Sequence, residues 1–332
     1  MAAVSRPVAN LHLPSVTKRA PWQDRPETRI SNWISLWDFE EPIDAGLIGA
    51  PYSSASISAS GAAGGPEAVR MAFRYNTTYT PDWDTDIKDL TVRDLGDIGG
   101  HLTDVSIAHG NIEQAVRDAL TISGPFVPVI VGGDHSITAP AVRGFAAANA
   151  GKKIGIINID AHYDVRVTDW GPHNGTPFRQ LVEGGVASGK NVVELGIHGF
   201  MNASYYRQWA NEQGITTITG RDVHKRGMEA CILEALGIAG DGTDLIYVSV
   251  DIDCLAYPWA AGTSASSAEG LSAWDLLEAM YICGQHPNVA ALDVVEIDPT
   301  KDVHDQTARS GCSTILTFLA GLYRRIYGDR GY

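Results

Sequence analysis

The chain has 332 residues, of which 44% are hydrophobic and 19% are charged, so a folded globular protein is expected and a largely disordered chain is not. Its formal net charge of −14 argues against nonspecific binding to nucleic acid or to an anionic membrane surface. No apolar run is long enough for a membrane helix, and the N-terminus lacks the apolar core of a secretory signal, so we expect a cytoplasmic protein. The cysteines form no C-x-x-C pair and are interpreted as reduced thiols: Cys231, Cys254, Cys283 and Cys312.

Residues 1–40 differ from the rest of the chain. They contain several prolines and the tryptophans Trp22, Trp33 and Trp37, without a clear hydrophobic period. We interpret them as an extended N-terminal arm that packs on a neighbour or covers a site, with a partly ordered tail as the alternative. Residues 41–332 show no linker, repeat or low-complexity break, and are predicted to form one catalytic domain.

From residue 45 onward, apolar runs alternate with helix-like stretches. The eight strand-like runs are 45–51, 92–99, 126–133, 153–160, 191–198, 215–220, 244–253 and 289–299. The helix-like stretches are 65–76, 111–122, 203–214, 228–237, 272–284 and 313–328. Strands that are apolar on both faces and alternate with helices indicate a parallel sheet covered on both sides. We therefore predict an α/β fold, a single three-layer domain with an eight-stranded, mostly parallel sheet.

Three of the predicted strands end in acids and histidines. Residues 132–136 read G-G-D-H-S, residues 160–164 read D-A-H-Y-D, and residues 251–253 read D-I-D. Residues two apart on an extended chain point the same way, and ligands gather at the carboxyl ends of parallel strands. We therefore expect two imidazoles and four carboxylates to converge there: His135, Asp160, His162, Asp164, Asp251 and Asp253.

Four carboxylates buried together need compensation, because their mutual repulsion and desolvation are costly. Divalent cations supply it, and a set of oxygens and imidazoles without thiolate suits Mn²⁺, and also Ni²⁺, Co²⁺ or Zn²⁺. Six ligands with two bridging carboxylates are enough for two metals, which can turn a water held between them into a hydroxide nucleophile. Either the D-x-D or the G-G-D-H-S segment alone fits a cap or a turn, but the three segments together favour a metal centre.

Four blocks of the sequence, G-G-D-H-S, D-A-H-x-D, S-x-D-x-D and V-E-I-D-P, resemble the signature of the ureohydrolase family in their order and spacing. This family includes arginase, agmatinase, formiminoglutamase and guanidino-acid hydrolases, and the resemblance extends over roughly residues 45–328. It implies an arginase-like fold and hydrolysis of linear amidine C–N bonds at a binuclear centre, with Mn²⁺ as the first expectation and Ni²⁺ as the main alternative. It further implies a homo-oligomer, a trimer or hexamer, with a paralogous subunit or a metal-loading protein as other partners to consider.

The resemblance also implies a role for each matching residue. One metal would be held by His135, Asp160, Asp164 and Asp251. The other would be held by Asp160, His162, Asp251 and Asp253, with Asp160 and Asp251 bridging. Asp164 would accept a hydrogen bond from the bridging hydroxide and return the proton. Glu296 would pair with the cationic group of the substrate, while Asp298 is interpreted as structural.

Two segments depart from the family pattern. Arginase and agmatinase carry a histidine directly before the glycine of an H-G-x-P segment, where this chain has Asn174, with His173 one residue earlier. We predict that either His173 serves as the proton shuttle or the shuttle is absent, and we assign Asn174 to substrate binding. The loop after Asp253 reads W-A-A-G-T-S, where a Pro-Gly pair is usual, and this predicts an unusual substrate.

Three other segments, D-A-H-Y-D-V-R, N-G-T-P-F-R-Q and L-G-I-H-G-F-M-N, look more like formiminoglutamases than arginases. Arg166 and Arg179 are then candidates to bind a substrate carboxylate, with surface acids as the alternative partners. His198 ends a predicted strand on the same rim and is a further candidate for substrate contact.

Three hypotheses for function follow. The first is a hydrolase that uses metal-bound hydroxide to cleave a small guanidino compound (guanidine, an alkylguanidine, a biguanide or a guanidino acid) into urea or a substituted urea and an amine. The second is a formimidoylglutamase, which releases formamide. The third is a catalytically inactive subunit that supports an active partner in a mixed assembly.

Overall fold

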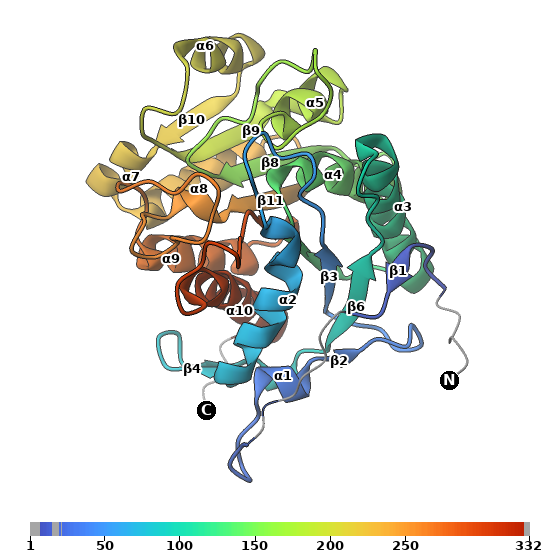
Figure 1. Cartoon of the computed structure of the whole chain (residues 1–332). Coiled ribbons are helices and arrows are strands. Elements are labelled where there is room, and N and C mark those ends of the chain that lie inside the picture. The colour runs from blue at the N-terminus through green and yellow to red at the C-terminus, as the bar shows by residue number, and fades with distance from the viewer. Residues whose placement is uncertain (1–6, 15–19, 21, 329–332) are drawn as a thin grey trace.

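The computed structural model describes residues 7–14, 20 and 22–328. In this part of the chain, ten strands form one sheet with the order β1-β6-β3-β7-β12-β11-β8-β9-β10, and β2 also pairs with β6 (Figure 1). The strands of this sheet are β1 (Leu11–His12), β2 (Ser35–Leu36), β3 (Ala45–Ala50), β6 (Val92–Ile98), β7 (Val127–Gly132), β8 (Ile154–Ile159), β9 (Ala187–Ile197), β10 (Thr216–Thr219), β11 (Leu245–Asp251) and β12 (Val289–Val295). A separate hairpin consists of β4 (Tyr79–Thr80) and β5 (Thr85–Asp86).

The eight predicted runs are the eight strands from β3 to β12 of this sheet, and neighbours among them pair in parallel. The predicted α/β fold with a mostly parallel sheet is confirmed. Two short strands of this sheet were not predicted, and both lie along the outer edge of β6; the separate β4–β5 hairpin was not predicted either. Strand β2 pairs with Arg93–Asp94 and β1 pairs antiparallel with Asp97–Ile98. They cover backbone groups that an edge strand otherwise leaves unpaired.

The predicted N-terminal arm supplies both of these edge strands. Trp37 is buried, stacks on Phe39 at 4.5 Å between ring centroids, and meets the edge of Phe126. The described part of the arm therefore packs on its own chain, while Trp22 is exposed. Residues 1–6, 15–19 and 21 of the arm lie outside the described residues, and its separation from the catalytic domain at residue 40 stays a prediction.

Helices cover both faces of the sheet and give the three layers (Figure 1). One face packs against α2 (Gly65–Ala72), α8 (Met228–Ala239), α9 (Ala273–Gln285) and α10 (Gln306–Tyr327). The other face packs against α3 (Val105–Ser123), α4 (Thr138–Ala148), α5 (Pro177–Glu183) and α6 (Ser204–Gln213). Successive strand residues enter opposite cores, as Ile156 and Ile157 do. This explains why the strands read as continuous apolar runs.

Six of these helices match predicted stretches, and Ser272 forms the expected capping box with Asp275 at the start of α9. Helices α4, α5 and α7 (Gly220–Arg226) were missed, as was the short α1 (Ile30–Trp33). Helix α4 is buried along most of its length, so its sequence lacks the polar face that makes a helix recognisable. Among the described helices, none has both the length and the apolar character needed to cross a membrane.

Candidate metal and substrate site

The predicted site residues follow four strands that are neighbours in the sheet, β7, β12, β11 and β8. His135 opens a 3-10 turn three residues after β7, Asp160 directly follows β8, Asp251 ends β11, and Glu296 directly follows β12. Because these strands are parallel, their carboxyl ends lie at one edge of the sheet. The topology thus brings together side chains that are up to 161 positions apart, the separation of His135 and Glu296.

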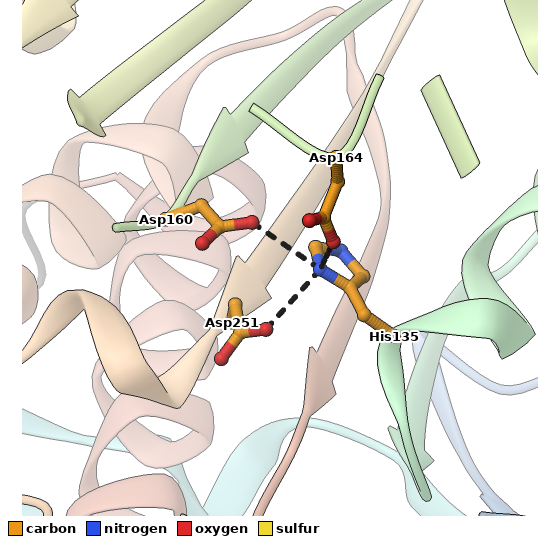
Figure 2. Close-up of side chains that lie close together, drawn as sticks. All are labelled: His135, Asp160, Asp164 and Asp251. Carbon is orange, nitrogen blue, oxygen red and sulfur yellow. Dashed lines mark ion pairs between the residues drawn. The ribbon is translucent and has the colours of Figure 1, made fainter. Parts of the chain in front are cut away.

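Three carboxylates surround one nitrogen of His135 (Figure 2). Its Nδ1 lies 2.9 Å from Asp164, 3.2 Å from Asp251 and 3.3 Å from Asp160. The His135 side chain is fully buried, and ligand atoms of the four residues lie within 4.8 Å of one another. This group matches the first predicted metal position in all four members.

A second group forms beside it around His162. The His162 Nδ1 lies 3.1 Å from Asp253 Oδ2 and 3.5 Å from Asp160 Oδ1. Asp160 belongs to both groups, with one oxygen facing each histidine, as a bridging ligand requires. Asp251 lies in the first group, where its Oδ2 faces His135, and its bridging role stays a prediction. Its Oδ1 accepts the backbone N–H of Asp253 at 2.9 Å, as Asp160 Oδ1 accepts that of His162 at 2.6 Å.

The tautomer of His135 is set by a hydrogen-bond chain behind it. Ser249 Oγ donates to Asp293 at 2.6 Å, so its oxygen accepts from His135 Nε2 at 3.0 Å. The Asp293 carboxylate is also held by the hydroxyls of Tyr247 and Thr138. Nε2 therefore carries a hydrogen, which leaves Nδ1 as the ring nitrogen that a divalent cation could bind in place of a proton, and Nδ1 has no hydrogen-bond partner among the described residues. One imidazole nitrogen and three carboxylate oxygens that face a common point are a suitable set of ligand atoms for a divalent cation.

The acids and histidines shift one another's pKa strongly. Burial alone lowers the pKa of His135, but the carboxylates of Asp160, Asp164 and Asp251 outweigh it and hold the pKa well above its ordinary value. Burial, Asp253 and Asp160 raise the pKa of Asp251 well above its ordinary value. Burial and the charge of Asp160 raise the pKa of Asp164 to about 6. Without another positive charge nearby, these side chains therefore keep their protons to a higher pH than usual. A divalent cation would bind the same nitrogen and oxygen atoms and would displace those protons.

Asp164 and Glu296 have left-handed backbone conformations, with φ of 47° and 63°. Side chains other than glycine rarely adopt this region, and such strain is concentrated at functional sites. At Asp164 it turns the carboxylate toward His135, and at Glu296 it turns the chain inward directly after β12. The strain supports functional rather than structural interpretations of both residues.

Glu296 is buried, with 2% of its surface exposed, and its two oxygens are held differently. Oε1 accepts the backbone N–H of His135 and the side-chain amide of Asn174, both at 3.0 Å. Among the described residues, Oε2 accepts one hydrogen bond, from the hydroxyl of Ser264 at 3.2 Å. Burial and the nearby charge of Asp134 raise the pKa of Glu296 to about 7. A buried carboxylate with an acceptor site left on Oε2 is suited to bind a cationic group.

A cavity of about 350 Å³ opens onto this site. Its described lining includes seven of the predicted site residues: His162, Asp164, Arg166, Asn174, Asp251, Asp253 and Glu296. Arg166 is the sole arginine or lysine among the described lining residues. Its guanidinium lies over the ring of Tyr206, 5.1 Å from the centroid, and donates to the Tyr206 hydroxyl at 2.7 Å. The cavity thus has an acidic floor and one fixed cation on its wall.

Sequence reasoning did not identify several wall residues. Tyr206, Asn202, Ile57 and Ser58 line the cavity, and none carries a motif that could have pointed to it. Asn202 belongs to the L-G-I-H-G-F-M-N segment, where only His198 was singled out. Asn202 instead anchors that segment, because its amide donates to the carbonyls of Ala161 and His198.

Three other predicted residues lie elsewhere. His173 is not among the described lining residues, and its Nδ1 accepts the backbone N–H of Gly175 at 3.1 Å within its own turn. His198 contacts the carbonyl of Gly196 and the hydroxyl of Ser267 through its two ring nitrogens. Arg179 is buried over Trp209, with its guanidinium 4.2 Å from the ring centroid. These local partners do not favour a proton shuttle at His173 or substrate contacts at the other two.

Comparisons with known proteins agree with this geometry. The model of the Arginase family matches residues 43–321. The chain is 38% identical to the formimidoylglutamase of Halalkalibacterium halodurans, over 91% of this chain and 94% of the relative. The crystal structure of formimidoylglutamase from Bacillus subtilis superposes with a TM-score of 0.86 at 36% identity, over 91% of this chain and 94% of that one. Trypanosoma cruzi formiminoglutamase, solved with two Mn²⁺ ions, gives a TM-score of 0.82 at 28% identity, over 90% of this chain and 99% of that one.

Proposed function

Because the chain belongs to the arginase family, whose members hydrolyse C–N bonds of linear amidines, we propose that it is a formimidoylglutamase. The observation that carries this proposal is identity of 36–38% to two bacterial formimidoylglutamases across 91% of the chain. This favours the second hypothesis from the sequence over the guanidino hydrolase that was placed first.

We propose that the two groups of ligands hold two Mn²⁺ ions, as in the Trypanosoma cruzi relative. One position would use His135, Asp160, Asp164 and Asp251, and the other would use Asp160, His162 and Asp253. Bound there, divalent cations would lower the pKa of an attacking water and offset the charge of the acids. Hard oxygens and imidazoles without thiolate support manganese, with nickel as the alternative to be tested.

The charges along the cavity support a substrate with a cationic head and an anionic tail. A formimidoylglutamate molecule has both, in its amidinium group and its carboxylates. We propose that Glu296 receives the amidinium through Oε2 and that Arg166 receives a carboxylate. Tyr206 would keep the Arg166 guanidinium in place, because it contacts that group through both its ring and its hydroxyl.

The proposed reaction adds water to the formimino carbon and breaks the bond from that carbon to the glutamate nitrogen. The products are formamide and glutamate, and one proton of the water ends on the departing nitrogen. Asp164 would carry this proton, and two observations support this role: its carboxylate lines the cavity and lies beside His135 at the proposed metal position. Glu296 holds the amidinium so that the carbon faces the same position.

The proposal is tested by product analysis on the purified, Mn²⁺-loaded chain. We expect formamide and glutamate in equal amounts from formimidoylglutamate, and less turnover of guanidino acids. Glu296→Gln removes the charge but keeps the shape, and should raise the KM by ~10-fold or more, because it removes a charge-assisted contact. A fully metal-loaded protein that releases urea from a guanidino compound, and no formamide, would contradict the proposal.

We further propose a cellular location and an oligomeric state. A cytoplasmic location accords with the four buried, free cysteines, which suit a reducing compartment. A trimer or hexamer is proposed from the family resemblance, and mass measurement in solution tests it. The inactive-subunit hypothesis is excluded if the purified chain turns over substrate alone, and supported if full metal loading gives no turnover without a second protein.

A further inference from the structure

A row of buried polar side chains crosses the sheet two positions before the ligand acids. In register on neighbouring strands, the row contains Glu194 (β9), Asn158 (β8), Ser249 (β11) and Asp293 (β12). All four residues are fully buried. Because alternate residues of a strand point to one face, Asn158 lies on the face of Asp160. Ser249 and Asp293 support the candidate ligand histidine of the first group, whereas Asn158 and Glu194 lie toward Asp160.

The Asn158 amide connects Glu194 to Asp160. Its Nδ2 donates to Asp160 Oδ2 at 3.1 Å and to Glu194 Oε2 at 2.7 Å. Asp160 Oδ2 is the oxygen that faces His135, while Asp160 Oδ1 accepts the backbone N–H of His162 at 2.6 Å. A carboxylate oxygen offers about two lone-pair sites. Each oxygen of Asp160 therefore has one donor from the described protein and keeps one lone pair for a metal.

Two atoms of this contact are buried without a hydrogen-bond partner among the described residues, namely Asn158 Oδ1 and Glu194 Oε1. An ionised Glu194 leaves both atoms as unpaired acceptors, and the burial of such atoms is costly. A proton on Oε1 turns that oxygen into a donor, for which the oxygen of the neighbouring amide is an unpaired acceptor. Burial also raises the pKa of Glu194 well above its ordinary value, although the Asn158 hydrogen bond opposes this shift.

We propose that Glu194 is a positioning residue for the metal site: as a neutral acid it joins the Asn158 amide through two hydrogen bonds and fixes the N–H that holds Asp160. In this pair Glu194 Oε1–H donates to Asn158 Oδ1, and Nδ2 donates to Oε2. The other N–H of the same nitrogen is then directed at Asp160 Oδ2. The inference rests on the proposed metal site and adds a support for one ligand carboxylate from outside the sequence motifs. A neutral Glu194 also adds no negative charge to the four ligand aspartates, whose charges two dications balance.

The test measures the Kd of Mn²⁺ by calorimetric titration of the chelator-treated chain. Glu194→Gln is the rescue variant, because an amide accepts from Nδ2 and donates to Oδ1 as the neutral acid does, so its Kd should stay within about twofold. Glu194→Met keeps the length of the side chain but offers no oxygen to the Asn158 amide. It should raise the Kd by ~10-fold or more, as the loss of a group that orients a metal ligand does.

Thr217→Val is the matched control. Thr217 pairs in register with Glu194 on β10, and its buried hydroxyl has no hydrogen-bond partner among the described residues. This variant removes a buried polar group from the same row without touching the Asn158 amide. It should change the Kd of Mn²⁺ by less than about twofold.

A purely structural role for Glu194 predicts a different result. Glu194→Met would then lower the free energy of unfolding of the metal-free chain and leave the Kd of the folded protein unchanged, which would overturn the inference. Equal weakening in Glu194→Gln and Glu194→Met would overturn it as well, because the Gln variant keeps both hydrogen bonds. A wild-type chain that binds no Mn²⁺ contradicts the proposed metal site instead, so the two failures are distinguishable.

Infrared spectroscopy tests the proton on Glu194 and does not need the Met variant to fold. The difference spectrum between the Mn²⁺-loaded wild-type chain and Glu194→Gln should contain the carbonyl band of a buried carboxylic acid, which the variant lacks. A difference spectrum with carboxylate bands in its place would show that Glu194 is ionised and would overturn the inference.

Discussion

Two groups of buried carboxylates are compensated in different ways in this protein. On β6, Asp94 and Asp97 are paired with Arg70 of α2, which lies 2.8 Å and 2.6 Å from them. At the candidate metal site, the described residues include no lysine or arginine in an ion pair with the four acids, and only two histidines face them. Acids paired within the chain stabilise a fold, whereas acids left without a cation mark a place for one that is not part of the chain.

The largest expected effect comes from a substitution among the acids at the candidate metal site. Asp251→Asn keeps the shape of the side chain but removes a ligand charge from the first group. We expect kcat/KM to fall by about 10³-fold or more, with loss of bound Mn²⁺, because a metal centre contributes several kcal/mol to transition-state stabilisation. Kinetics and elemental analysis measure both. Asp94→Asn is the matched control, which should leave the activity of the folded protein within a few-fold.

Removal of Arg70 would make the acids on β6 resemble the acids at the candidate metal site. Arg70→Met leaves two buried carboxylates without their cation, so we expect the free energy of unfolding to fall by about 3–5 kcal/mol. Denaturant titration measures this change. Arg226→Met, which breaks the exposed pair with Glu234, should leave the midpoint nearly unchanged. If the two variants lowered the free energy of unfolding equally, burial of the ion pair would not explain its contribution to stability.

A third kind of buried titratable group is His109, which forms no ion pair with an acid among the described residues and gives a pH-dependent contrast with the other two regions. Burial and then the charge of Arg143 lower the pKa of His109 to about 4, from an ordinary value of 6.5. Above pH 6.5 both folded and unfolded chains keep it neutral. As the pH falls from 6.5 to 4, the unfolded chain binds the proton first, so stability falls by about 3 kcal/mol in total. His109→Gln should flatten this part of the stability profile, and an unchanged profile would exclude the effect.

Metal addition gives the smallest effect when it is counted per site, and it should act on one region alone. Mn²⁺ at 100 times its Kd should raise the free energy of unfolding by about 2.7 kcal/mol for each site. The same increment is expected in Arg70→Met, because the paired acids on β6 do not take part. It should be reduced in Asp251→Asn. Thermal unfolding with and without a chelator measures the increment, and its absence from the wild-type chain would contradict a metal site.

The sequence predicted a cluster of acids and histidines because their convergence depends on local geometry. Alternation along an extended chain gives Asp160 and His162 a common direction, and parallel strands place their carboxyl ends together. The left-handed backbone at Asp164, by contrast, follows from no motif in the D-A-H-Y-D segment. Helix α4 was missed for a related reason, because its burial on most sides removes the periodic pattern that local reasoning requires.

By itself the sequence determined the fold class and predicted six candidate ligand residues and the chemistry that they favour, since these follow from hydrophobic period and residue type. Only the tertiary structure showed which of the candidate acids lie together, with Asp160 in both groups of side chains. It alone showed that Asn174 contacts Glu296, which is 122 positions away, and that the ring of His173 accepts a hydrogen bond within its own turn. Such contacts depend on how loops from different strands meet, and no spacing along the chain encodes the distance between two loops.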